Sequence, residues 1–155
     1  MSAKLEVSFN SPQCGWMSIG FDDGINEFHT TTAHAPHSNA LSELLNILVD
    51  VLDDNTEDFS RKLEWNRDPE EFDFIFGRRG AEASIKIIEY PTGSRDQEKA
   101  ETVYVYSGDK KQIAQAFYKT FRQLYDERNI DEFEQNWHQK FPVEEMNDLF
   151  KALEK

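Results

Sequence analysis

Four short segments between residues 59 and 106 constrain the fold more than any other feature of the sequence. In the second segment Phe72, Phe74 and Phe76 occupy alternate positions, and a side-chain period of two is typical of a strand with one face in the core. The predicted strands cover residues 59–65, 71–76, 83–90 and 102–106. Residues 77–80, Gly-Arg-Arg-Gly, predict a tight loop between the second and third strands. Short connections of this kind favour an antiparallel meander.

The first thirty residues predict a separate hairpin. Apolar residues alternate in two runs, which are Leu5, Val7, Phe9 and then Met17, Ile19, Phe21. Asp22-Asp23-Gly24 ends the second run as a turn, and a third short strand is expected at about residues 27–31. The βαβαβ alternation of a doubly wound fold is absent from the sequence.

Helices are predicted in two places. Five leucines between residues 41 and 52 follow a helical spacing, with Ser38 or Asn39 as the N-cap, so a helix is expected over about residues 39–53. The last third of the chain has capping signals at Asp109 and Asp131 and a proline, Pro142, suited to a first helical position. Met146, Leu149, Phe150 and Leu153 are the predicted buried face of the last helix. We therefore expect one α+β domain over residues 1–155, with helices packed on one face of an antiparallel sheet.

Composition excludes several classes of protein. Twenty aromatic residues are too many for a disordered polyanion. The longest uncharged apolar run, residues 44–49, is far shorter than the roughly 20 residues that cross a bilayer. The first residues lack the apolar core of a signal peptide, so a cytoplasmic location is expected. A single cysteine, Cys14, excludes an internal disulfide and a multi-cysteine zinc site.

Negative charge is concentrated at the start of the chain. The net charge is −13, and residues 1–60 hold ten acidic residues against one basic residue. Such a field repels nucleic acid and anionic lipid and attracts cationic partners, so we expect a basic protein partner, no nucleic acid and no membrane. The predicted partner-binding residues are the acids of the hairpin turn and of the helix end, namely Asp22, Asp23, Glu27, Asp50, Asp53, Asp54, Glu57 and Asp58. Acids at a helix C-terminus oppose the helix dipole, and such a locally unfavourable choice often marks function.

No pattern predicts catalysis or a cofactor. His29, His34 and His37 lack the HExxH register of a zinc helix, and Cys14 lies in no recognisable nucleophile motif. Residues 77–80 lack the spacing and the Lys-Ser/Thr pair of a phosphate-binding loop. We therefore expect no bound metal, no cofactor and no hydrolase activity.

Several segments resemble a group of small uncharacterised bacterial proteins. These segments are residues 15–19, the start of the leucine helix at residues 37–45, Trp65, and Asp-Pro-Glu-Glu-Phe at residues 68–72. By general type, a small acidic α+β protein also resembles bacterial toxin-immunity proteins, and that resemblance implies an inhibitor that masks a basic surface of its partner. A generic adaptor domain and a small cytosolic enzyme with an unrecognised site remain open alternatives. The sequence leaves the partner and the oligomeric state undetermined.

Overall fold

The computed structural model describes residues 4–34, 39–55, 57–67, 69–126 and 130–155, the side chains of residues 130 and 131 excepted. The strands are β1 (Glu6–Phe9), β2 (Trp16–Asp22), β3 (Glu27–Ala33), β4 (Phe59–Asn66), β5 (Glu71–Arg79), β6 (Glu82–Tyr90) and β7 (Glu101–Asp109). The α-helices are α1 (Ala40–Leu52), α2 (Lys110–Asp126), α3 (Ile130–Trp137) and α4 (Val143–Leu153), and a short 3-10 helix spans Gln97–Lys99.

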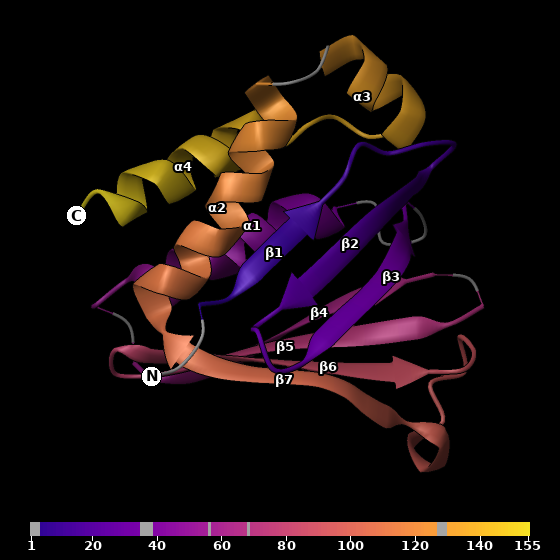
Figure 1. Ribbon diagram of the computed structural model, residues 1–155, viewed down its shortest axis with the longest axis horizontal. Coiled ribbons are helices and arrows are strands. Elements are labelled where there is room, and N and C mark those ends of the chain that lie inside the picture. Colours follow the sequence, from indigo (N-terminus) through magenta and orange to yellow (C-terminus); the bar gives the residue numbers. More distant parts are fainter. Residues whose placement is uncertain (1–3, 35–38, 56, 68, 127–129) are drawn as a thin grey trace.

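The strands form two antiparallel sheets, so the predicted α+β fold is confirmed. One sheet has the order β1-β2-β3 and the other is the meander β4-β5-β6-β7. In Figure 1 the first sheet and the helices lie on the same side of the β4–β7 sheet. The inner face of that meander is therefore covered by a layer that contains both strands and helices.

The predicted loop at residues 77–80 is wrong, because β5 continues through Arg79 and the turn lies at Gly80 and Ala81. Gly77 pairs with Ser60 on one side and Ser84 on the other, and a Cβ on Gly77 would come within 2.8 Å of the Ser84 hydroxyl oxygen. Gly77 thus serves close packing between strands. Gly80, with φ of +61°, is the residue that needs a glycine's backbone freedom for the turn.

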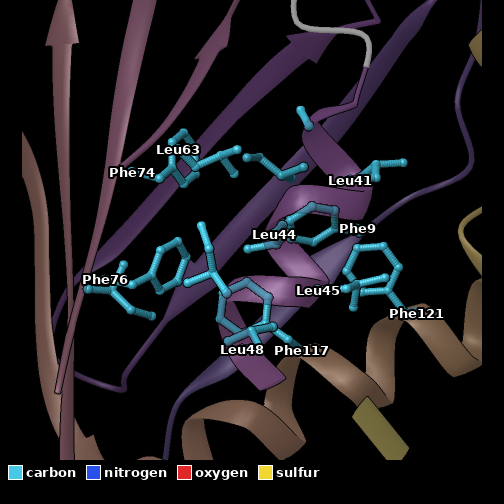
Figure 2. Packing of buried hydrophobic residues seen from close by; sticks show 14 of the residues in the cluster. Phe9, Leu41, Leu44, Leu45, Leu48, Leu63, Phe74, Phe76, Phe117 and Phe121 are labelled. Carbon is cyan, nitrogen blue, oxygen red and sulfur yellow. The ribbon is translucent and has the colours of Figure 1, made fainter. Parts of the chain in front are cut away.

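The core lies between the two sheets and helices α1 and α2. The Phe21 ring of β2 lies 6.3 Å from the Phe74 ring of β5 and 5.6 Å from the Tyr104 ring of β7. Figure 2 shows the leucines of α1 and the phenylalanines of α2 turned toward the same space. The buried leucine stripe of α1 is as predicted, and it comprises Leu41, Leu44, Leu45, Leu48 and Leu52.

Helix ends differ in detail from the sequence-based expectation. Asp109 caps α2 as predicted, since its carboxylate accepts a hydrogen bond from the Gln112 amide at 3.1 Å. Asn39 precedes α1 but makes no side-chain capping bond, and Ser38 lies outside the described residues. Phe150, predicted to be buried, is 44% exposed and packs against Tyr118 of α2, because α4 turns Met146 and Leu149 toward the core instead.

The first prediction concerns Phe117, a fully buried residue of α2 that contacts the rings of Phe9, Phe21 and Phe76. Phe117→Ala should lower the free energy of unfolding by about 3–5 kcal/mol, because it removes buried apolar surface and leaves a cavity. Urea denaturation measures the change. The matched control, Val105→Ala at a residue that is 53% exposed, should cost about 0.5 kcal/mol or less. Equal effects of the two substitutions would contradict the assigned core.

Candidate functional site

Basic side chains from later strands and helices pair with the acids at the end of α1. Asp50 forms an ion pair with Arg61 of β4 at 2.6 Å, and Asp54 pairs with Lys110 at the start of α2. The Lys110 ammonium lowers the pKa of Asp54. Asp58 accepts a hydrogen bond from the Gly80 amide at 2.9 Å. Asp53 accepts a hydrogen bond from the Asn55 amide at 2.9 Å. Four of the five predicted partner-binding acids at this helix end therefore make contacts within the fold.

Arg78 of β5 supplies the cation that α1 lacks in its own last turn. Its guanidinium donates hydrogen bonds to the main-chain carbonyls of Val51, Asp53 and Glu57, at 3.3 Å for Val51 and 3.0 Å for Glu57. Unpaired carbonyls at a helix C-terminus favour a cation. The unfavourable charge pattern read from the sequence is thus offset by a residue that lies 26 positions beyond the helix end.

Asp23, one of the predicted partner-binding acids, is a buried structural residue of the β2–β3 turn. Its side chain accepts hydrogen bonds from the amides of Asn26 at 2.7 Å and Ile25 at 2.9 Å, and from the Tyr104 hydroxyl at 3.0 Å. The residue is only 7% exposed. These donors, above all the Asn26 and Ile25 amides, hold the pKa of Asp23 below its usual value. Burial and the adjacent Asp23 carboxylate raise the pKa of Tyr104.

The two groups of predicted acids are anchored at different points of β7. The hairpin turn is tied to Tyr104, whereas Asp54 is tied to Lys110, which follows the last residue of β7, Asp109. Tyr104 and Asp109 are five positions apart, which corresponds to about 17 Å at the rise of a strand. Asp22 is partly exposed and Glu27 is exposed, so these two hairpin acids are accessible to a partner.

A groove of about 590 Å³ runs between β1 and α2, and we call it the edge groove. Its strand side is formed by residues 4–8 with Asp22 and His29, and its helix side by Gln115, Ala116, Lys119 and Gln123. The volume lies within the range of 300–1,000 Å³ that is usual for binding sites. Of the eight predicted partner-binding acids, Asp22 lines this groove.

Strand β1 is an edge of its sheet, and the pairing register shows which backbone groups face the groove. The Asn10 amide donates to the Ser18 carbonyl of β2. Because backbone groups along an edge strand alternate in direction, Ser8 and Glu6, two and four residues earlier, also direct theirs toward β2. Val7 and Phe9 then point their backbone groups away from β2. Consistent with this, the Phe9 amide donates to the Thr120 hydroxyl of α2 at 2.8 Å.

Thr120 closes one end of this strand edge and leaves the other end open. Its hydroxyl accepts from the Phe9 amide and lies 3.3 Å from the Phe9 carbonyl, to which it donates. Val7 lies two residues before Phe9 on the same strand edge. Among the described residues, neither its amide nor its carbonyl has a hydrogen-bond partner. The open part of the edge is therefore the part that borders the edge groove.

The outer wall of the groove is a row of residues on neighbouring strands. Ser8, Gly20 and His29 are opposite one another on β1, β2 and β3, and a Cβ on Gly20 would lie 2.5 Å from His29 Nδ1 and 2.9 Å from Ser8 Oγ. Glycine therefore lets the imidazole ring approach the sheet. In the described part of the chain no hydrogen bond joins Ser8 to His29, which is the contact through which a histidine activates a serine.

A second polar cluster lies on the outer face of the β4–β7 sheet. Arg95 forms ion pairs with Glu71 at 2.7 Å, with Glu64 at 3.4 Å and with Asp73, and its guanidinium stacks over the Tyr90 ring. The Tyr90 hydroxyl donates to Asp73 at 2.8 Å. These contacts anchor the loop after β6 to the sheet, so we assign the cluster a structural role.

The sequence analysis missed the helix side of the edge groove. Gln115, Lys119 and Gln123 are spaced four residues apart on α2, and in sequence they are indistinguishable from an ordinary solvated helix face.

Among the other candidates, His34 Nδ1 lies 3.2 Å from the Gly15 carbonyl oxygen, and His37 is outside the described residues. Across the ranges that the structure describes, no group of three or more His, Cys, Asp or Glu side chains is arranged to hold a metal ion.

A second prediction tests the role of Arg78. Arg78→Met keeps most of the side-chain volume but removes the donors to three carbonyls at the end of α1, so the free energy of unfolding should fall by about 2–4 kcal/mol. Urea denaturation at neutral pH gives the value. Arg79→Met, at the exposed neighbouring position, is the matched control and should change stability by about 0.5 kcal/mol or less. A loss at Arg78 no larger than that of the control would exclude this capping role.

A third prediction concerns the pH dependence that Asp23 confers. Its folded-state pKa lies below the ordinary value of 3.8, so the carboxylate stabilises the fold above that value, and the contribution is lost as the pH falls through the folded-state pKa. Asp23→Asn should lower stability by about 1 kcal/mol at pH 7, since it keeps an acceptor but loses the charge. The difference from the unmodified protein should shrink below pH 4. Urea denaturation at pH 7 and pH 3 measures both values, and a difference that grows at pH 3 would contradict the assignment.

Comparison with known proteins leaves the chain without an assigned family. It matches no protein-family model, and neither a curated protein nor a solved structure matches it at a significant level. Within the described residues, no helix combines the length and the apolar character needed to cross a bilayer. The resemblance to small bacterial proteins and to toxin-immunity proteins therefore stays a hypothesis from the sequence.

Proposed function

We propose that the protein is a non-catalytic protein-binding domain that takes up an extended segment of a partner protein as an additional strand beside β1. The observation that carries the proposal is the open edge at Val7, whose amide and carbonyl point into the edge groove. A free strand edge is a template for pairing with another chain. Domains that bind peptides by strand addition obtain affinity from main-chain hydrogen bonds and specificity from alternate side chains.

The shape of the groove supports an extended ligand. Residues 5–8 border it along about 13 Å of strand, which is room for three or four residues of a partner at the same spacing. Helix α2 forms the opposite wall, on which Ala116 is buried and the longer polar side chains of Gln115 and Lys119 are exposed. The reciprocal contact of Thr120 with Phe9 limits how far such a strand can extend.

The net charge supports a basic partner. A total of −13 attracts a cationic protein over long range and accelerates its association. The predicted partner-binding acids Asp22 and Glu27 are accessible, and Asp22 lies at the groove itself. An inhibitor of a basic toxin, as the resemblance in type implies, is one form that this function takes. In that form the segment bound beside β1 belongs to the toxin.

A fourth prediction tests strand addition with a single substitution. Random heptapeptides displayed on phage are selected on the immobilised full-length protein, and the enriched peptides are synthesised and titrated by fluorescence polarisation. Val7→Pro removes the outward-facing amide but no bond to β2, and proline is tolerated on an edge strand, so the variant should fold. It should weaken peptide binding at least tenfold, because the central main-chain donor is lost.

Val7→Ala is the matched control, since it trims the same side chain but keeps the amide, and it should bind within about threefold of the unmodified protein. Amide shifts in NMR spectra should be confined to residues 5–8 and to the groove face of α2. Failure to enrich any peptide, or full binding by a folded Val7→Pro variant, would overturn the proposal.

A further inference from the structure

Three carboxylates form a row across the first sheet that leads to the open edge. Glu6 of β1 is opposite Asp22 of β2, and Asp22 is opposite Glu27 of β3. All three residues have the strand parity of the outer face, on which Glu6 and Glu27 are exposed. We call Glu6, Asp22 and Glu27 the acidic row.

Such a row is unfavourable as it stands. Side chains directly opposite on antiparallel strands lie about 5 Å apart, and like charges in that position are destabilising. Within the described part of the chain, none of the three carboxylates takes part in an ion pair. Lys4 and Lys119 line the same groove, and among the described residues neither forms an ion pair with the row.

Glu6, at one end of the acidic row, lies on the edge strand β1, directly beside the position that an added strand would occupy. A strand paired to β1 places one side chain directly beside Glu6, on the same outer face. The next residue of that strand is opposite Val7, and its side chain points inward toward Ala116 and the apolar side of the groove. The two faces of the added strand therefore meet different chemistry.

Building on the proposed function, we infer that the bound segment carries a lysine or arginine opposite Glu6 and a small apolar residue opposite Val7. The basic side chain extends the row to four strands and neutralises part of its charge. Antiparallel pairing of two β1 strands centred on Val7 would place Ser8, which is not a cation, opposite Glu6. Pairing centred on Leu5 would place Lys4 there, but the net charge of −13 on each copy opposes the association of two copies. The occupant is thus a basic, alternating segment of another protein.

The test compares three labelled, acetylated and amidated heptapeptides that have valine or alanine at alternate positions. The intervening positions are lysine in the first peptide, glutamine in the second and glutamate in the third. Binding to the full-length protein is measured by fluorescence polarisation at 50 mM and 300 mM salt. The lysine peptide should bind about threefold to tenfold more tightly than the glutamine peptide, as expected for one or two cross-strand ion pairs, and the glutamate peptide should bind most weakly.

Glu6→Lys should reverse this order, so that the glutamate peptide binds best. Glu98→Lys changes the net charge equally at an exposed residue of the 3-10 helix and should leave the order unchanged. Reversal by both variants would assign the preference to the overall field and overturn the inference. Equal binding of all three peptides, each still abolished by Val7→Pro, would overturn the inference but keep strand addition. If none of the three peptides binds and no phage-selected peptide binds either, both the inference and strand addition are overturned. A dimer that the Val7→Pro substitution dissociates would assign the edge to a second copy of the chain instead.

Discussion

The ring of Phe117 packs where the two sheets and helix α2 meet. It contacts Phe9 and Phe21 from the first sheet and Phe76 from the second. Because these rings are buried and closely packed, α2 cannot move relative to β1 without opening a cavity. The position of α2 then determines which backbone groups of β1 are covered, since Thr120, three residues further along the helix, reaches Phe9. The edge groove exists because this one packing arrangement holds the helix beside the strand and not over it.

Charge in this protein is balanced mainly between distant parts of the chain. The first 60 residues hold the acidic excess. At the end of α1, Asp50 and Asp54 form ion pairs with Arg61 and Lys110, and Arg78 binds main-chain carbonyls. The exposed pair of Asp50 with Arg61 contributes little to stability, whereas the buried Arg78 closes several backbone bonds at once. In the described part of the chain, Glu6, Asp22 and Glu27 on the outer face of the first sheet take part in no ion pair.

The proposed function joins two features that are separate in origin. An open strand edge provides affinity for any extended chain, and by itself it would be a liability. In this proposal the acidic row next to that edge restricts which chain is accepted, because a basic side chain would offset a repulsion that an acidic one would increase. Long-range attraction and short-range selection then act in the same direction on a basic partner.

The sequence by itself determined the secondary structure and the class of fold. Alternation identified the strands, and the leucine and phenylalanine stripes identified α1 and α2, because side-chain period is a local property of the backbone. It failed at residues 77–80 and at Phe150, where the packing of neighbouring strands and helices decided the outcome. It also grouped eight acids by proximity in the chain, of which Asp23 became a buried turn residue and Asp54 an ion-pair partner of Lys110. Only the tertiary structure decided where the groove lies. A backbone amide such as that of Val7 is open or covered according to which strand and helix pack beside it. For β1 the helix is α2, whose residues lie more than one hundred positions further along the chain.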